Sequence, residues 1–308
     1  MITKFLPQIA HSIDIIHGQK GTAKTTTLRK DKSIVDPDKC LTLGLPKALD
    51  ALAIMLSNYY FVCFDNIDRF SADVSDMLCT ASTGGAFVAR KHHTNDESVI
   101  LEFKRPVSLN GINVVATRPD LLDRGIILKL EPIAKSERRT EAELWAEFDK
   151  AKPHILGVIF SILSKALAIY PTVELDELGR MADFTLWGYA VAEAAGLGGD
   201  NFLQAYLDNQ NRINVEAVDA NPVAMLIVMF MKGKNDWNGT PTALFRELTQ
   251  LADDEKIDTK SIYWPKQPNQ FTRRLNEVRA NLEVLGYTVE SNTSGNRKIR
   301  ITNTNARD

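Results

Sequence analysis

The sequence has few cysteines and no long apolar run, and these two absences exclude several classes of protein. Only three cysteines occur among 308 residues, and no two of them form a Cys-x-x-Cys pair. A disulfide framework and a cysteine-rich zinc site are therefore not expected, whereas a reducing cytoplasm fits this usage. The longest apolar runs, such as Ala224–Met231, are far shorter than the roughly 20 residues that cross a bilayer, and the first residues lack the apolar core of a secretory signal. We expect a soluble, cytoplasmic protein with no membrane partner.

A large excess of charge of either sign is also absent, because the net charge is −2. On its own this value indicates no nucleic-acid partner. The charge is nevertheless uneven: residues 1–134 carry 16 basic and 15 acidic side chains, residues 135–220 carry 8 and 14, and residues 221–308 carry 13 and 10. The length suits two or three domains. We expect three, divided at residues 134 and 220.

Residues 1–134 alternate short apolar runs with stretches long enough for helices, which predicts an α/β fold with a parallel sheet as its core. The expected strands are Ile13–His17, Cys40–Leu45, Tyr59–Phe64, Val107–Val115 and Ile126–Leu130, and the expected helices are Lys24–Ile34, Pro46–Asn58 and Asp68–Ser82. One stretch breaks the alternation. Ala86–His92 and Val99–Phe103 flank a polar segment, which predicts an inserted β-hairpin.

Residues 135–220 predict a helical domain, with amphipathic stretches at Glu141–Lys150, His154–Ile169 and Leu175–Ala195. The pattern changes again after Asn221. Three helices are expected there, followed by two short strands around residues 291–296; the helices are Val223–Gly233, Thr240–Asp253 and Asn269–Leu285. Three helices and a hairpin are the outline of a winged helix-turn-helix domain.

The strongest motif is GQKGTAKT, which spans Gly18–Thr25 between an apolar strand and a helix and is typical of a phosphate-binding loop. Backbone N–H groups of small residues can surround a phosphate, and the helix N-terminus adds positive potential. We expect ATP to bind here with Mg²⁺ held by the Thr25 hydroxyl; the binding residues would be Gly18, Gly21, Thr22, Ala23, Lys24, Thr25 and Thr26. Ala23 stands where a glycine is usual. The alternative is a glycine-rich turn that binds nothing.

A second candidate follows the continuously apolar run Tyr59–Phe64. Asp65 comes at the carboxyl end of this expected strand, where open α/β sheets bind ligands, and it would be the second Mg²⁺ carboxylate. Asn66 follows, where many such ATPases have a catalytic glutamate. An amide cannot accept a proton from water, so hydrolysis would depend on positioning or on a carboxylate such as Asp68. The alternative is an aspartate that caps a turn.

These motifs occur in order with two others, RPVSLNGI and ATRPDLLDR, and the sequence resembles AAA+ ATPases. More narrowly, it is similar to the helicase modules of phages and mobile elements that are often attached to primases and are akin to superfamily 3 helicases. The resemblance covers essentially the whole chain. It implies a hexameric ring and a C-terminal winged helix.

The resemblance also implies roles for individual residues. Asn110 matches the sensor asparagine that polarises the attacking water, and Arg124 matches the arginine finger that enters a neighbouring subunit. Arg118 matches a second interface arginine, and Arg180 fits the sensor arginine of the helical lid. The alternatives are a strand-end turn for Asn110, an ion pair with Asp120 or Asp123 for Arg124, and an ordinary exposed side chain for Arg180.

Two basic groups are candidates for nucleic-acid binding. The hairpin carries Arg90, Lys91, His92 and His93, which can grip phosphates without reading sequence. The adjacent histidines could suggest a metal, but no third ligand is evident. On the last helix and the final strands the candidates are Arg273, Arg274, Arg279, Lys298 and Arg300. The alternatives are an exposed charged hairpin and a protein-docking winged helix.

The sequence therefore predicts an enzyme that hydrolyses ATP to move along or unwind DNA. The assigned domains are an AAA+ core (1–134), a helical lid (135–220) and a winged helix (221–308). A first alternative keeps ATP binding without efficient hydrolysis, as in a DNA-associated switch or loader. A second is a winged-helix regulator whose phosphate loop is vestigial. Because about a dozen residues precede the first strand, a primase or initiator is expected either on another chain or in a part of the protein outside this sequence.

Overall fold

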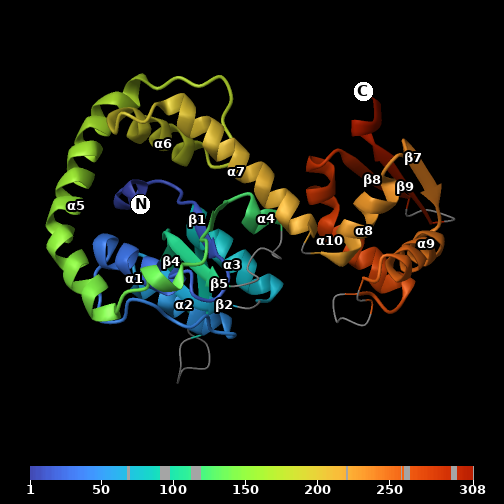
Figure 1. The fold of residues 1–308 in the computed structure, drawn as a ribbon, viewed down its shortest axis with the longest axis horizontal. Helices are drawn as coiled ribbons and strands as arrows, with labels where there is room; N and C mark the ends of the chain where they lie inside the picture. The colour runs from blue at the N-terminus through green and yellow to red at the C-terminus, as the bar shows by residue number, and fades with distance from the viewer. Residues whose placement is uncertain are drawn as a thin grey trace. The chain divides into compact units, whose positions relative to one another are not determined.

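The computed structural model of the chain describes residues 1–67, 70–90, 98–111, 119–219, 221–257, 259, 264–292 and 297–307. These residues form two compact units (Figure 1). The first unit contains residues 1–114 and 123–210, and the second contains residues 115–122 and 211–308. The division into three domains at residues 134 and 220 stays a prediction.

The described residues of the first unit are built around a parallel sheet of four strands. In the order β2-β5-β1-β6 these are β2 (Val62–Ile67), β5 (Val107–Gly111), β1 (Ile13–His17) and β6 (Gly125–Lys129). All three pairs of neighbours run parallel. Every residue of β5 is buried, as expected for a central strand that is covered on both faces. The prediction of an α/β fold with a parallel sheet core is confirmed.

Three helices follow the strands of this core: α1 (Lys24–Val35), α2 (Leu49–Asn58) and α3 (Ala72–Thr83). Helices α1 and α3 pack on the sheet, and α2 packs on α3. The hydroxyl of Ser71 accepts a hydrogen bond from the backbone N–H of Val74, which caps α3 and sets its start. The helix therefore begins at Ala72 and not at the predicted residue 68.

The predicted strand Cys40–Leu45 is wrong. Within it only Leu43 pairs with the sheet, in an isolated bridge to Phe64 of β2. The N–H of Leu43 donates to the carbonyl of Cys63, and its carbonyl accepts from the N–H of Asp65, both at 2.9 Å. Pro46 follows closely and has no N–H to extend such a ladder, so the pairing stays local.

Strands β3 (Gly85–Arg90) and β4 (Ser98–Phe103) pair separately from the parallel sheet. They form an antiparallel ladder of six residue pairs, from Gly85 opposite Phe103 to Arg90 opposite Ser98. The segment that joins them, residues 91–97, lies outside the described residues.

The helical part of the first unit contains α5 (Glu141–Ile169), α6 (Ala182–Ala194) and the larger part of α7 (Gly199–Asp219). The two stretches predicted within 141–169 are one helix, which continues through Pro153. A proline inside a helix costs about 3 kcal/mol. Phe148, Ile159 and Ala166 are the buried residues along this helix and hold it against the rest of the unit. The helix expected to begin at Leu175 begins only at Ala182, after the short 3-10 turn Tyr170–Thr172.

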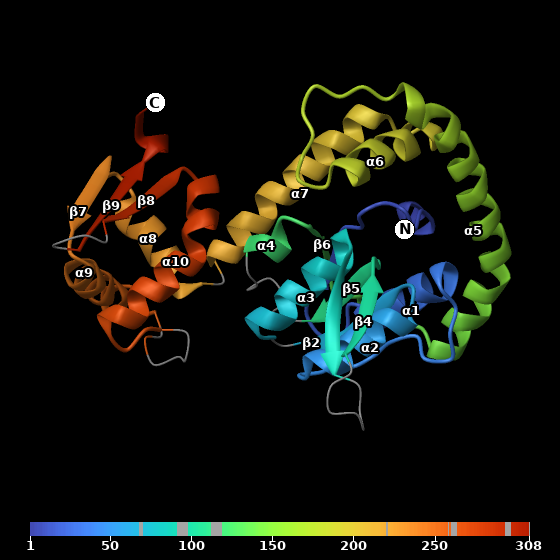
Figure 2. The same cartoon turned by 180° about the vertical axis from the view of Figure 1, so that it is seen from behind.

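The N-terminal segment joins these helices to the core of the unit. It contains the 3-10 helix Ile2–Phe5, and its Leu6 and Ile9 pack against Ala166 of α5 and Trp187 of α6. Figures 1 and 2 both show this segment inside the curve that α5 and α6 make. The N-terminal segment therefore shares one buried apolar cluster with both helices.

The stretch Glu141–Thr172 is long and apolar enough to cross a membrane by length and composition alone. Its most apolar window has a mean hydropathy of 1.7, and 11% of that window is buried. Polar residues such as Ser161, Ser164 and Lys165 lie between the apolar residues, which is why the sequence shows no long uninterrupted apolar run here. Core helices of soluble proteins also have this composition, so the observation is weak evidence for a membrane span.

The second unit combines helices with a three-stranded antiparallel sheet in the order β7-β9-β8. Its elements are α4 (Pro119–Leu122), α8 (Pro222–Met231), β7 (Asp236–Gly239), α9 (Pro241–Asp254), α10 (Pro268–Val284), β8 (Tyr287–Asn292), β9 (Lys298–Asn303) and the 3-10 turn Thr304–Arg307. Apolar side chains of α8, α9, α10 and the sheet form one buried cluster. Strand β7 is not predicted from the sequence, because a four-residue strand with a polar sequence has no apolar alternation.

Candidate nucleotide-binding site

The phosphate loop, residues Gly18–Thr25, connects the carboxyl end of β1 to the first turn of α1. Gly18 needs a small residue, because a Cβ atom there would lie 2.5 Å from the carbonyl oxygen of Leu130. Ala23 has a left-handed backbone, with φ of +59°, immediately before the helix begins at Lys24. The alanine thus adopts the conformation that favours glycine at this position.

The amine of Lys24 lies within the curve of the loop. It donates hydrogen bonds to the carbonyl oxygens of Gly18 at 2.7 Å and Gln19 at 2.9 Å. The Thr22 hydroxyl donates to the same Gln19 carbonyl at 3.1 Å. These bonds place a cation at the start of α1, where the helix also contributes positive potential. Thr26 is half-buried in the first turn of this helix.

Asp65 and Asn110 meet Thr25 at the end of the phosphate loop. The Asp65 Oδ1 atom accepts from the Thr25 hydroxyl at 3.2 Å and from the Asn110 amide at 2.5 Å. Asn110 is buried, and its Oδ1 atom has no hydrogen-bond partner among the described residues. The three residues come from α1, β2 and β5, so the sheet order itself brings them together.

The ladder between β2 and β5 is irregular at the catalytic candidates. The register shifts between Phe64 and Ile67, and Asn66 has a left-handed backbone with φ of +58°. The backbone N–H of Asn66 donates to Asp65 Oδ1 at 2.8 Å, while its side chain is exposed. Asp68, the nearest alternative carboxylate, lies outside the described residues.

Arg124 lies at the amino end of the parallel strands, which is the end opposite the phosphate loop, and Arg180 lies near it. The carbonyl of Arg124 accepts from the N–H of Ile13 at 2.8 Å, at the start of β1, whereas the phosphate loop follows the end of that strand. The Arg180 guanidinium pairs with the Asp123 carboxylate at 3.5 Å. The structure therefore does not bring either arginine to the phosphate loop of its own chain. Arg118 lies outside the described residues.

The predicted nucleic-acid residues divide into those that the structure describes and those that it does not. The side chain of Arg90 and residues Lys91, His92 and His93 lie outside the described part. On α10, Arg273 and Arg274 both contact the carboxylate of Glu277, at 3.3 and 2.9 Å, and Arg279 is exposed. Lys298 and Arg300 are exposed on one face of β9, and Ile299 and Ile301 are buried on the other.

A buried charge cluster lies beneath the nucleotide-site candidates, and sequence reasoning missed it. Lys4 forms ion pairs with Asp14 and Asp31, each at 2.5 Å, and the Ser108 hydroxyl donates to Asp14 at 2.8 Å. Burial alone would lower the pKa of Lys4, but the two carboxylates raise it. Burial would raise the pKa of Asp14, but Lys4 lowers it. Lys4 and Asp14 are therefore charged at neutral pH.

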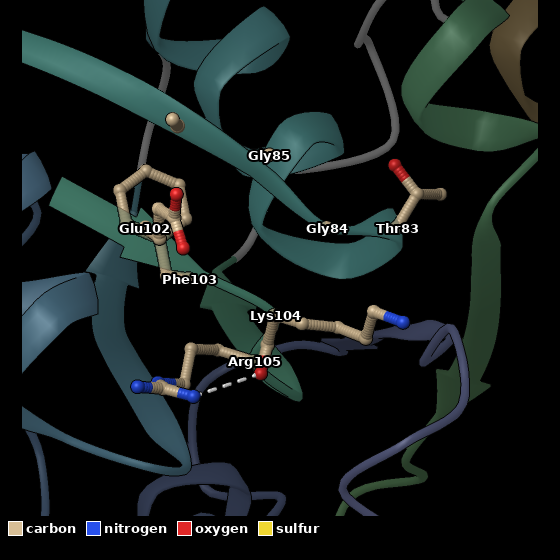
Figure 3. Close-up of a pocket in the computed structure, with 8 residues that line it drawn as sticks. Thr83, Gly84, Gly85, Glu102, Phe103, Lys104 and Arg105 are labelled. Carbon is tan, nitrogen blue, oxygen red and sulfur yellow. Dashed lines mark hydrogen bonds between the residues drawn. The ribbon is translucent and has the colours of Figure 1, made fainter. Parts of the chain in front are cut away.

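A shallow pocket of about 610 Å³ lies at the base of the β3–β4 ladder (Figure 3). The two cationic side chains that line it already donate hydrogen bonds to backbone carbonyls. The Lys104 amine donates to the Gln8 carbonyl, and the Arg105 guanidinium donates to the carbonyls of Leu56 and Lys104. Figure 3 shows the two side chains extending in different directions. The pocket shares no lining residue with the phosphate loop, so it does not coincide with the place where the chemical groups gather. In the described part of the chain, no cluster of three or more His, Cys, Asp or Glu side chains could hold a metal.

Three solved structures illustrate what the chain is similar to. The SCCmec type IV Cch active helicase is 15% identical with a TM-score of 0.45, over 99% of this chain and 64% of that one. The NrS-1 C-terminal region is 12% identical with a TM-score of 0.41, over 98% and 69%. The JCV helicase is 14% identical with a TM-score of 0.34, over 64% of each chain. The chain thus spans less than two thirds of the Cch structure, and likeness at this level carries no argument about function.

Family comparisons are more decisive. No curated protein matches the chain. The family model for the actinomycete integrative conjugative element replication protein matches residues 1–212, and the model of the AICE RepA C-terminal domain matches residues 223–308. The first match alone covers more than half of the sequence and contains the whole phosphate loop. The chain belongs to the replication proteins of actinomycete integrative conjugative elements.

Proposed function

We propose that this replication protein is an AAA+ ATPase that uses ATP to unwind or move along DNA. One observation carries the proposal: Thr25, Asp65 and Asn110 converge at the carboxyl end of the parallel sheet, where the phosphate loop that holds the Lys24 amine ends. A phosphate-binding loop, a metal-binding hydroxyl, a carboxylate and a polar sensor are the set that phosphoryl transfer from ATP needs. A cytoplasmic location is part of this proposal.

The residues present fit Mg²⁺ and ATP. Asn110 Oδ1 is a buried acceptor without a partner in the described structure, and the Lys24 amine binds loop carbonyls that a phosphate can replace. Thr25 and Asp65 would hold the metal ion, which would supply positive charge to the phosphate oxygens. Lys24 and the loop N–H groups would bind the phosphates, and Asn110 would orient a water molecule.

Asn66 favours a specific alternative, which is a DNA-associated switch or loader that binds ATP and hydrolyses it slowly. Its exposed amide cannot act as a general base. In the motor proposal Asn66 positions the water instead. Its exposed side chain and its left-handed backbone within the irregular part of β2 support this role.

The position of Arg124 supports assembly into a ring, which the proposal takes to be hexameric. The arginine is half-buried at the amino end of the parallel strands, opposite the end that bears its own phosphate loop. A finger at the amino end can complete only a neighbour's site, as in head-to-tail rings. The pairing of Arg180 with Asp123 places it beside Arg124, so its proposed role as a sensor of its own nucleotide has no local support.

The second unit supports a DNA-binding winged helix within this proposal. The order α8, β7, α9, α10, β8, β9 with a β7-β9-β8 sheet is that of a winged helix. Helix α10 would contact DNA through Arg273, Arg274 and Arg279, and the exposed face of β9 would add Lys298 and Arg300. A primase or an initiator on another chain remains the proposed protein partner.

The proposal is tested by steady-state ATP turnover with and without single-stranded DNA, together with strand separation on a forked duplex. DNA-stimulated turnover with unwinding supports the motor. ATP binding with little turnover selects the switch or loader. Absence of ATP binding in the wild-type protein selects a winged-helix regulator with a vestigial phosphate loop. Lys24→Ala is the control, because removal of the amine should abolish ATP binding in a folded protein.

A further inference from the structure

Arg138, which no motif singles out, lies against the phosphate loop. Gly21 has a left-handed backbone with φ of +83°, and a Cβ atom placed on it would lie 3.2 Å from Nη2 of Arg138. The guanidinium therefore lies directly beside the Gly21 backbone. The only sequence signal is a polar segment after the last strand of the sheet, which does not predict this contact.

The segment that carries Arg138 is tied to the loop and to α1. The N–H of Leu130 donates to the carbonyl of His17 at 2.9 Å, and the N–H of Ile133 donates to the carbonyl of Gly21 at 3.3 Å. The 3-10 turn Lys135–Glu137 follows. Glu141, at the start of α5, then pairs with Arg29 of α1 at 3.1 Å. Arg138 thus lies between two attachments, and its backbone is fixed beside the loop.

The charge of Arg138 is not neutralised within the described structure. Its side chain is exposed, and it forms no ion pair or hydrogen bond with another described residue. The next residue differs: Arg139 pairs with Glu147 at 2.5 Å. An unpaired guanidinium beside a phosphate loop has two or more donors for phosphate oxygens, which a lysine amine cannot present in one plane.

We propose that Arg138 binds the phosphate chain of the nucleotide held by the phosphate loop of its own subunit, as a second cation beside Lys24. The proposal rests on the proposed function, because it needs that loop to bind ATP. It assigns to the linker between β6 and α5 a role in the same subunit, whereas Arg124 is proposed to act on a neighbour.

The test measures the affinity for ATP with Mg²⁺ by titration calorimetry in Arg138→Lys, Arg138→Gln and Arg138→Glu. Loss of a charge-assisted contact should weaken binding about ten- to a hundredfold in Arg138→Gln. The loss should be smaller in Arg138→Lys and larger in Arg138→Glu, since the order follows charge. Arg139→Glu is the matched control: it changes the net charge equally one residue away and should bind nearly as wild type.

The melting temperature of each nucleotide-free variant provides a second measurement, and it should stay at the wild-type value because Arg138 has no described partner to lose. Equal affinities for Arg138→Glu and Arg139→Glu, with Lys24→Ala inactive in binding, would overturn this proposal alone. Unchanged affinity in Lys24→Ala would overturn the proposed function and this proposal together. Tighter binding by Arg138→Gln would also overturn it, since the guanidinium would then be obstructing the loop.

Discussion

Ala23 holds a left-handed backbone in a loop where glycine is the usual residue. For alanine this conformation costs roughly 1–2 kcal/mol, which exceeds the backbone entropy that glycine adds to the unfolded chain. We expect Ala23→Gly to raise the free energy of unfolding by about 0.5–1 kcal/mol in urea denaturation, with ATP affinity kept. Ala168→Gly, in the regular helix α5, is the control and should destabilise. A destabilised Ala23→Gly protein would contradict the strain argument.

Lys4 is buried between two carboxylates, and its removal should cost far more than the loss of a surface charge. Lys4→Met keeps the apolar stem but leaves Asp14 and Asp31 uncompensated, so we expect the free energy of unfolding to fall by about 3–5 kcal/mol. Lys165→Met on the exposed face of α5 should change it little. Adding Asp14→Asn and Asp31→Asn to Lys4→Met should restore part of the loss. If the triple variant is no more stable than Lys4→Met, the charges are not coupled.

His11 makes stability depend on pH. Burial, then the charges of Lys4 and Lys104, lower the pKa of this histidine to about 4. The unfolded chain, whose histidine has a pKa near 6.5, binds the proton first as the pH falls. Stability is therefore fully present above pH 6.5 and is lost towards pH 4, by at most about 1.4 kcal/mol per pH unit. His11→Phe, which retains the ring contact with Tyr60, should flatten this part of the pH profile of chemical denaturation. An unchanged slope would assign the acid sensitivity to other groups.

At the level of single elements, Glu277 limits the positive charge of α10. It accepts hydrogen bonds from Arg273 and Arg274, which lie on the face proposed to meet DNA. Glu277→Gln should release both guanidinium groups, tighten DNA binding several-fold at low salt and steepen its salt dependence. Fluorescence anisotropy over a salt series measures both effects. Glu283→Gln, on the same helix, changes the net charge equally and should have a smaller effect; equal responses would mean that only net charge matters.

The elements also show what a sequence can predict and what it cannot. The phosphate loop, the strand that bears Asp65 and the helices after residue 221 follow from local patterns of apolar residues, glycines and caps. Strand β7 and the isolated pairing of Leu43 depend on partners far along the chain, which no local pattern contains. The contact of Arg138 with Gly21 is of the same kind, since it depends on how the chain leaves β6.

At the scale of the whole assembly, the positions of Lys24 and Arg124 at opposite ends of the parallel strands predict active sites that two subunits share. Lys24 follows the carboxyl end of β1, whereas Arg124 lies at its amino end. Each proposed site would therefore combine Lys24 from one subunit with Arg124 from the next. Rings of pure Lys24→Ala or pure Arg124→Ala should both be inactive. In an equal mixture about a quarter of the head-to-tail interfaces keep both residues. Mixing the two inactive proteins should therefore restore part of the ATPase activity.

Two controls make the mixing experiment decisive. Subunit exchange is verified by energy transfer between differently labelled proteins. If subunits exchange and no activity returns, Arg124 does not act on a neighbour. Appreciable activity of the pure Arg124→Ala protein would contradict the shared site equally directly.

Strand β5 links the buried charge cluster to the proposed site. Ser108 and Asn110 are two residues apart on this strand and project from the same face; Ser108 bonds to Asp14, and Asn110 bonds to Asp65. In evolutionary terms we expect the three charged residues of this cluster, Lys4, Asp14 and Asp31, to be kept or replaced together. A lineage that replaces one of these charges passes through an unstable intermediate, so the three are expected to change as a block or not at all. We therefore expect substitution of Lys4 to be limited by the need to keep Asn110 in place on β5.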